Sequence, residues 1–159
     1  MIKNFLEIKN VDFCIGGNIK VKNVSFSIEK EGDIVCLLGP SGIGKTTILR
    51  TIAGLEKVNT GLIKLNNRIL SSNEIHIEPE HRNISLAFQE NSLFPHYTVE
   101  KNILLGAERN KQKKDKKISL KEIVKILGIS HILNKYPHQI SAGEAQRASL
   151  ARSVITKPD

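Results

Sequence analysis

The segment that decides the fold is rich in glycine and reads Gly39-Pro40-Ser41-Gly42-Ile43-Gly44-Lys45-Thr46-Thr47. It matches the pattern G-x-x-x-x-G-K-[ST], which arises by chance on the order of once in a few hundred chains of this length. The glycines let consecutive backbone N–H groups turn inward around phosphate oxygens, and a following helix adds its dipole. Lys45 would supply a positive charge to the β- and γ-phosphates, and the Thr46 hydroxyl can bind Mg²⁺. The alternative is a turn that binds nothing, but the residues favour a nucleoside triphosphate site.

The segments on either side of this loop predict strands and a helix. Residues 34–38 are apolar without alternation, which is typical of a strand covered on both faces in a parallel sheet flanked by helices. Residues 48–53 predict a helix that ends at Gly54. Four other segments predict strands, the first two by the alternation of a half-buried antiparallel sheet: residues 6–8, 24–28, 62–65 and 84–88.

The pattern changes to helices after Phe88. Three helices are predicted, over residues 99–107, over residues 120–127, and from the residue after Ser141 to about Thr156. Their starts are marked by Thr98, by a capping box of Ser119 with Glu122, and by a second box of Ser141 with Glu144. These patterns indicate an α/β protein.

Composition bounds the class of protein without choosing its function. The chain has 159 residues, 40% of them hydrophobic and 25% charged, which predicts a single globular domain. A net charge of +8 suits nucleic acid, a membrane surface or any anionic ligand, whereas 4% aromatic residues and no Trp weaken a site built on stacked bases. Cys14 and Cys36 form no C-x-x-C pair, so reduced cysteines in a cytosolic protein are expected. The lysine-rich residues 111–117 are interpreted as a solvated loop rather than a specific anion site.

A phosphate loop alone does not decide the fate of the γ-phosphate, because switches, small kinases and motor ATPases all carry one. Hydrolysis normally also needs an acidic residue at the end of a neighbouring buried strand. Glu90 is a candidate, since it follows the predicted strand at residues 84–88. Gln89 is nearer to the strand end, however, so the preferred interpretation is that Glu90 opens a surface loop.

Three separated motifs resemble the ATP-binding subunits of ABC transporters, and the resemblance covers essentially the whole chain. They are the phosphate loop, the Phe88-Gln89 of a Q-loop, and Ile140-Ser141-Ala142-Gly143-Glu144-Ala145-Gln146-Arg147, which is similar to the family's signature L-S-G-G-Q-x-Q-R. The resemblance implies a P-loop NTPase (RecA-like) fold with a parallel-sheet core, an N-terminal antiparallel β subdomain and an α-helical subdomain. It divides a single incomplete domain into a β subdomain and P-loop core (1–89), a helical subdomain (90–140), and the signature motif with its helix (141–159).

The resemblance also implies roles for these residues. Two such domains would bind head to tail, with ATP and Mg²⁺ between residues 39–47 of one and the signature motif of the other. Lys45 and Gln89 would be catalytic, and Thr46 and Gln89 would hold Mg²⁺. Ser141 would offer its hydroxyl and Gly143 its N–H to the γ-phosphate, with Glu144 beside them. Capping of the helix is the alternative role for the Ser141 oxygen.

The sequence departs from the family pattern at three positions. Ala142 replaces a signature glycine, and somewhat weaker closure is expected. Glu144 stands where glutamine is commonest. Ile15, beside Phe13, aligns with the aromatic residue that stacks on adenine, so base stacking is expected to be weak or shifted, and either residue could contact the base.

Family members continue, beyond a segment similar to Lys157-Pro158-Asp159, into an apolar strand that ends in an Asp and a catalytic Glu. A switch His follows later. We therefore expect the sequence to be a fragment of a longer ATPase that binds nucleotide poorly and hydrolyses almost none by itself.

Three short segments, at residues 80–84, 93–96 and 136–140, are similar to the bacterial importer branch of the family. That branch serves ferric iron, polyamines, sulfate or molybdate, and ferric iron is the first choice for the cargo of this protein. The resemblance implies integral membrane permease subunits as partners, a solute-binding protein indirectly, no nucleic acid, and a peripheral place at the cytoplasmic face of the bacterial inner membrane. Surface or structural roles are favoured over iron ligation for the five histidines, His76, His81, His96, His131 and His138.

Two alternatives from other classes stay open. A small P-loop kinase would need an Arg-rich lid, but Arg109 is the only arginine between Phe88 and the signature motif. A nucleic-acid-associated ATPase of the same superfamily would use the positive net charge, and it would bind DNA with a steep dependence on salt.

Overall fold

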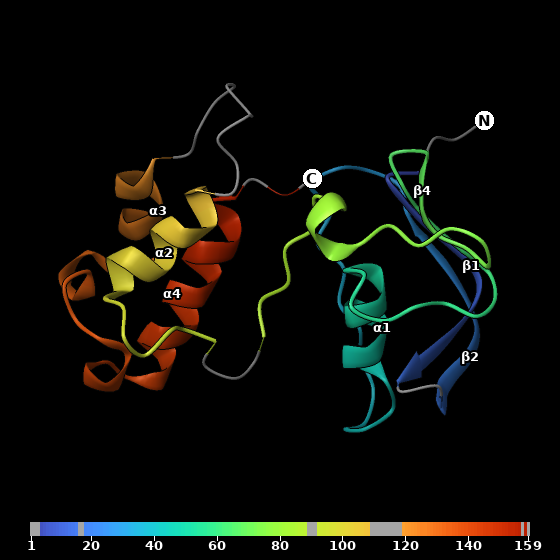
Figure 1. Cartoon of the computed structure of the whole chain (residues 1–159), viewed down its shortest axis with the longest axis horizontal. Helices are drawn as coiled ribbons and strands as arrows, with labels where there is room; N and C mark the ends of the chain where they lie inside the picture. Colours follow the sequence, from blue (N-terminus) through green and yellow to red (C-terminus); the bar gives the residue numbers. More distant parts are fainter. Residues whose placement is uncertain (1–3, 16–17, 89–91, 109–118, 157, 159) are drawn as a thin grey trace. The chain divides into compact units, whose positions relative to one another are not determined.

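The computed structural model describes residues 4–15, 18–88, 92–108, 119–156 and 158. These residues fall into two compact units, residues 1–82 and residues 83–159 (Figure 1). The family resemblance divides the chain between residues 89 and 90, and that division stays a prediction. Each unit has a buried core of its own and is described by itself.

The first unit is built on an antiparallel sheet. Its strands are β1 (Leu6–Ile15), β2 (Asn18–Ile28), β3 (Leu62–Leu65) and β4 (Arg68–Ser71), in the order β2-β1-β3-β4. Ile8 lies opposite both Phe26 on β2 and Ile63 on β3. The antiparallel strands predicted at residues 6–8 and 24–28, and the strand predicted at 62–65, are confirmed.

The turn between β3 and β4 shows why the sequence folds back here. Asn66 and Asn67 are its two residues, with φ of 48° and 66°. A two-residue hairpin turn of this kind requires positive φ at both positions, and asparagine tolerates that conformation better than most residues.

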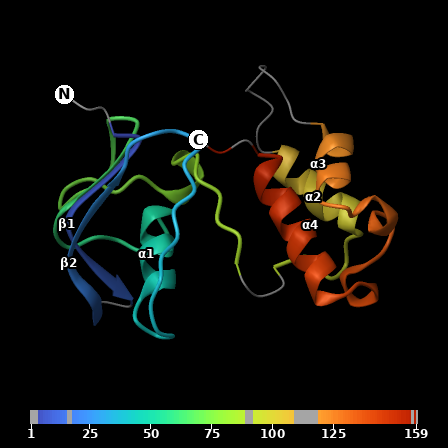
Figure 2. The same ribbon diagram turned by 180° about the vertical axis from the view of Figure 1, so that it is seen from behind.

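Helix α1 (Lys45–Ile52) packs against the sheet in both views (Figures 1 and 2). Its buried side is formed by Thr47, Ile48 and Thr51. The core of the sheet consists of residues that are at most 1% exposed, namely Ile8, Val11, Phe13, Ile63 and Leu70. The helix that carries the phosphate loop at its N-terminus therefore rests on the sheet.

Two predicted strands are wrong. Residues 34–38 and 84–88 are outside any strand, and Ile34 and Leu38 are 94% and 91% exposed rather than buried. An apolar run makes a strand only where a neighbouring strand accepts its backbone hydrogen bonds. No such partner lies beside these two segments among the described residues. All strand pairs in the described sheet are consequently antiparallel, and the expected parallel core is not among them.

The second unit is helical. Its helices are α2 (Val99–Glu108), α3 (Leu120–Ile126) and α4 (Ala142–Val154), and it also holds the 3₁₀ turns η2 (Ser130–Ile132) and η3 (Pro137–Gln139). α2 packs on α4, where the small side chains of Ala145, Ala148 and Ala151 are buried. The rest of this core includes Val99, Ile103, Ile123, Ile129 and Ile132. All three predicted helices are confirmed, although α4 ends at Val154 rather than near Thr156.

Local chemistry sets the starts of α3 and α4. Ser119 and Glu122 form a capping box, and Ser141 and Glu144 form another, as predicted. None of the described helices combines the length and the apolar character that a bilayer-spanning helix needs.

Candidate nucleotide-binding site

The phosphate loop has the backbone conformation that its glycines suggest. Gly39, Gly42 and Gly44 have φ of 149°, 82° and 110°. These values lie in the region where glycine is favoured because it has no Cβ. Gly44 also lies against β2, since a Cβ built on it would collide with Val21 Cγ2. The end of the loop is thereby held on the sheet.

The side chain of Lys45 links two carbonyl groups of the loop. Its ammonium donates to the carbonyl oxygens of Gly39 and Pro40, both at 2.7 Å. An ammonium has three donors, so two are engaged by the loop's own carbonyls and the third is left for a ligand. The positive charge therefore sits at the mouth of the loop.

The start of α1 adds further donors to this mouth. The first helical hydrogen bond runs from the Ile48 N–H to the Gly44 carbonyl at 3.0 Å, so the N–H groups of Lys45, Thr46 and Thr47 have no acceptor within the helix. No acidic residue occupies the first turn. Exposed Ser41, Gly42, Ile43 and Thr46 leave the loop open to a ligand. Unpaired N–H groups, the helix dipole and one ammonium together favour an anion.

Arg82, for which the sequence predicted no role in the site, lies at the other end of α1. Its side chain is 1% exposed, and it donates to the carbonyls of Thr51 and Ile52 at 3.1 and 3.0 Å. Burial lowers the pKa of the Arg82 guanidinium to about 10, so it stays charged at neutral pH. Sequence patterns gave no sign of this role, because the acceptors lie about thirty residues earlier in the chain.

The signature segment lies at the N-terminus of α4. The Ser141 hydroxyl accepts from the Glu144 N–H at 3.3 Å and donates to Glu144 Oε2 at 2.8 Å. The Ser141 N–H donates to the same carboxylate at 2.8 Å, and His131 Nε2 contacts Glu144 Oε1 at 2.9 Å. The Ser141 N–H and hydroxyl and then His131 lower the pKa of Glu144 to about 2. Ser141 therefore caps the helix in this structure, while Ser141 and Gly143 are both exposed.

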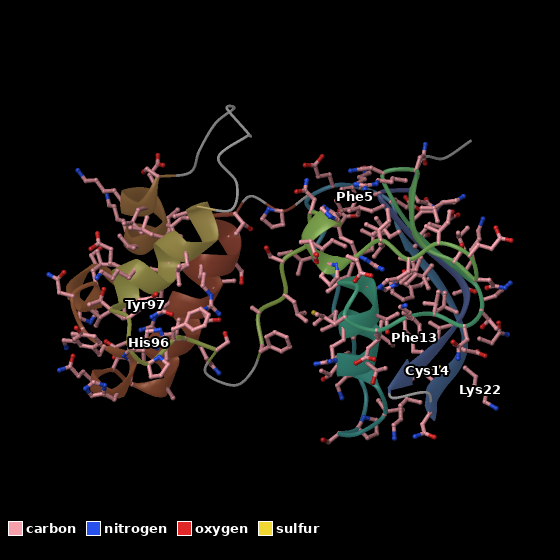
Figure 3. All side chains as sticks on the ribbon, in the orientation of Figure 1. Phe5, Phe13, Cys14, Lys22, His96 and Tyr97 are labelled. Atoms are coloured by element: carbon pink, nitrogen blue, oxygen red, sulfur yellow. The ribbon has the colours of Figure 1, made fainter. Side chains whose placement is uncertain are left out.

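The segment at residues 92–97 is tied to the helices of the second unit by partly buried polar contacts. Ser92 Oγ lies 3.0 Å from Ser149 Oγ and accepts from Arg152 Nη2 at 2.7 Å. Fully buried Asn102 accepts from the Phe94 N–H at 2.7 Å and donates to the Tyr97 carbonyl at 3.1 Å. His96 and Tyr97 lie side by side, with ring centroids 4.3 Å apart (Figure 3). This segment therefore has a defined shape.

Several predicted site residues are not placed by the structure. The structure does not describe Gln89, Glu90, the lysine-rich run at residues 111–117 or the side chain of Ile15. Phe13 is fully buried on β1 in the core of the first unit, so it offers no free face to an adenine base (Figure 3). In the described part of the chain, no group of three or more His, Cys, Asp or Glu could hold a metal ion.

Comparison with known proteins matches residues 21–159 to the family described as ABC transporter. The chain is 37% identical to the Fe(3+) ions import ATP-binding protein FbpC of Fusobacterium nucleatum, over 97% of this chain and 40% of that protein. It is 38% identical to the sn-glycerol-3-phosphate import ATP-binding protein UgpC of Brucella abortus, over 95% of this chain and 42% of that protein. It is also 42% identical to the molybdenum import ATP-binding protein ModC of Haemophilus ducreyi, over 85% of this chain and 37% of that protein.

A solved ATP-binding subunit of an ABC transporter superposes with a TM-score of 0.78 at 22% identity, over 97% of this chain and 63% of that one. A nucleotide-free ATP-binding cassette of an ABC transporter gives a TM-score of 0.76 at 24% identity, over 98% and 66%. These likenesses confirm the P-loop NTPase fold class. The chain spans less than half the length of the curated relatives that it matches.

Proposed function

Since the chain belongs to the ABC transporter family, we propose that it is the ATP-binding part of a subunit that energises the import of a solute. The observation that carries this proposal is the geometry of the phosphate loop. The Lys45 ammonium donates to the Gly39 and Pro40 carbonyls beside the exposed N-terminus of α1. The three curated relatives are all import ATP-binding proteins by name, which supports import as the direction of transport.

The donor set of the loop fits a triphosphate with Mg²⁺. The N–H groups at the start of α1 and the Lys45 ammonium would bind the β- and γ-phosphate oxygens. The exposed Thr46 hydroxyl would hold Mg²⁺ together with Gln89, and Mg²⁺ would neutralise charge that develops during phosphoryl transfer. Lys45 and Gln89 are the proposed catalytic residues.

We propose that a second copy completes the site. The exposed N-terminus of α4, with Ser141 and Gly143, would close over the γ-phosphate bound to the first copy, while Glu144 fixes the Ser141 hydroxyl. The helix dipole of α4 favours an anion at this end. To donate to the phosphate, the Ser141 hydroxyl would give up its hydrogen bond to the Glu144 carboxylate, because a hydroxyl has only one proton to donate.

The remaining partners follow from the same proposal. Membrane permease subunits would dock on the helical unit at the cytoplasmic face of the membrane, and a solute-binding protein would deliver the cargo to them. Ferric iron remains our first proposal for that cargo, although the relatives named above import iron, sn-glycerol 3-phosphate and molybdenum.

The proposal is tested by titrating the chain with a fluorescent ATP analogue, with and without Mg²⁺. We expect Mg²⁺-dependent binding and at least tenfold weaker binding by Lys45→Ala, about the effect of losing one charge-assisted contact. Arg68→Ala, at an exposed position on β4, is the matched control and should bind as the unchanged chain does.

No binding at any nucleotide concentration would refute the proposal. Steep salt-dependent binding to DNA instead would favour the nucleic-acid alternative. Steady ATP turnover by the chain that is lost in Lys45→Ala would bring Glu90 back as a catalytic candidate.

A further inference from the structure

Arg82 is the largest of the side chains that are almost fully buried, at 1% exposure. A guanidinium carries five N–H donors and no acceptor, and burying it is costly unless those donors are satisfied. A guanidinium kept in the core of the first unit therefore needs an acceptor for each of its donors. The contacts of the side chain show which groups supply them.

Among the described residues, the hydrogen-bond acceptors of Arg82 are uncharged groups from three parts of the first unit. Nη1 donates to the carbonyls of Thr51 and Ile52, and Nε donates to the Ile77 carbonyl at 2.6 Å. Nη2 donates to Ser71 Oγ at 2.7 Å and lies 3.3 Å from His76 Nδ1. One planar group thus joins the end of α1, the end of β4 and the segment after it.

The contact with α1 is made where that helix needs it. The last carbonyls of a helix have no partner within the helix, and a positive charge there interacts favourably with the dipole. Arg82 supplies the charge and donates to two of these carbonyls, and the Thr51 carbonyl also accepts from the Gly54 N–H at 3.1 Å. The backbone then leaves α1 through Gly54, where φ is 90° and an added Cβ would lie 2.9 Å from Arg82 Cδ and closer still to Nε. The end of α1 is therefore built around this guanidinium.

The other end of α1 is the phosphate loop. The helix has only eight residues, about 12 Å in length, and Lys45 is the first of them. Rigid secondary elements can carry coupling between two sites. In a helix this short, a shift at Thr51 and Ile52 would displace Lys45 and Thr46. Small misplacements of ligand-binding groups carry large costs in binding and catalysis.

We propose that Arg82 is a positioning residue for the nucleotide site, which fixes the C-terminal end of α1 and thereby holds Lys45 and Thr46 in place at the other end. This inference rests on the proposed function, because it assigns Arg82 to the site that binds ATP. Arg82 touches no nucleotide itself and acts through α1.

The test compares Arg82→Lys with Arg68→Lys in the full chain. Arg82→Lys keeps the charge but loses the planar fork, whereas Arg68 is exposed on β4 and serves as the matched control. Calorimetric titration with Mg²⁺-ATP, well below the melting temperature of each variant, separates the dissociation constant from the number of binding sites. We expect Arg82→Lys to raise Kd on the order of tenfold at an unchanged number of sites, and Arg68→Lys to change neither.

A merely structural role would give another result. It would lower the melting temperature and the number of competent sites but leave Kd of the folded fraction unchanged, and that outcome overturns the inference. If Arg82→Lys does not fold, Ser71→Ala removes one acceptor of the guanidinium and should raise Kd about twofold to threefold. An unchanged Kd in Ser71→Ala would also count against Arg82.

Hydrogen exchange of the α1 amides separates this inference from the proposed function. Arg82→Lys should speed exchange across residues 45–52 relative to Arg68→Lys, with or without nucleotide. If the unchanged chain binds no ATP, the proposed function fails, and a response of exchange in α1 then shows only that Arg82 stabilises the helix. If the chain binds ATP but Kd is the same in Arg82→Lys and Arg68→Lys, the positioning role alone fails. If exchange in α1 is the same in both variants, the positioning role is refuted whatever the chain binds.

Discussion

At the scale of the residue, Gly54 and Gly32 offer a matched pair. Both have φ near +90°, so an alanine at either position meets the same backbone strain, on the order of 1 kcal/mol. A Cβ on Gly32 would meet nothing within 4 Å, whereas one on Gly54 would collide with the Arg82 guanidinium. We expect Gly54→Ala to lower the free energy of unfolding by about 2 kcal/mol more than Gly32→Ala, because a packed and buried side chain must move. Urea unfolding of the two variants measures this difference, and equal losses would show that Arg82 yields without cost.

At the scale of the element, the start of α4 should respond to acid through Glu144. Its pKa is lowered from 4.5 to about 2 by the Ser141 N–H and hydroxyl and then by His131. A carboxyl whose pKa is lower in the folded state contributes stability that is fully present above pH 4.5 and is lost as the pH falls toward 2. We expect Glu144→Gln to lose less helicity than the unchanged chain as the pH falls from 4.5 to 2. Circular dichroism during an acid titration measures this loss. Glu100→Gln, in the first turn of α2, is the control and should leave that loss in place. An acid response of Glu144→Gln equal to that of the unchanged chain would contradict this role.

The elements also differ in how well sequence predicts them. The starts of α3 and α4 were predictable because Ser119 with Glu122, and Ser141 with Glu144, are three residues apart and act locally. The phosphate loop was predictable for the same reason, since its glycines and Lys45 form one short segment. Residues 34–38 were mispredicted because an apolar run indicates a preference for the strand but not the presence of a partner. Ser141 was left open between two roles: the structure shows it capping α4, and its role at the γ-phosphate stays a proposal.

At the scale of the whole molecule, sequence predicts the class of fold but misses the contacts that join distant segments. Three motifs in order indicated the family, which the comparisons confirm. Arg82 was missed because its partners Ser71, Thr51 and Ile52 lie 11 to 31 residues away along the chain. Periodicity and motif spacing report on neighbours in sequence, and so they contain no information on such a contact. The core of each unit has the same non-local character.

The two units of the molecule should respond separately to the loss of core packing. Ile103 is fully buried in the core of the second unit, and Ile63 is fully buried in that of the first. Replacing either isoleucine by alanine should lower the free energy of unfolding of its own unit by about 2–5 kcal/mol, through lost burial and the cavity left behind.

We expect Ile103→Ala to speed hydrogen exchange in α2 and α4 without changing the exchange rate in β1, β3 and α1. Ile63→Ala should do the reverse. Nucleotide binding should weaken more in Ile63→Ala than in Ile103→Ala, because the phosphate loop and α1 belong to the first unit. If exchange rose in both units in each variant, the two cores would unfold as one cooperative body, and nucleotide binding would then weaken equally in the two variants.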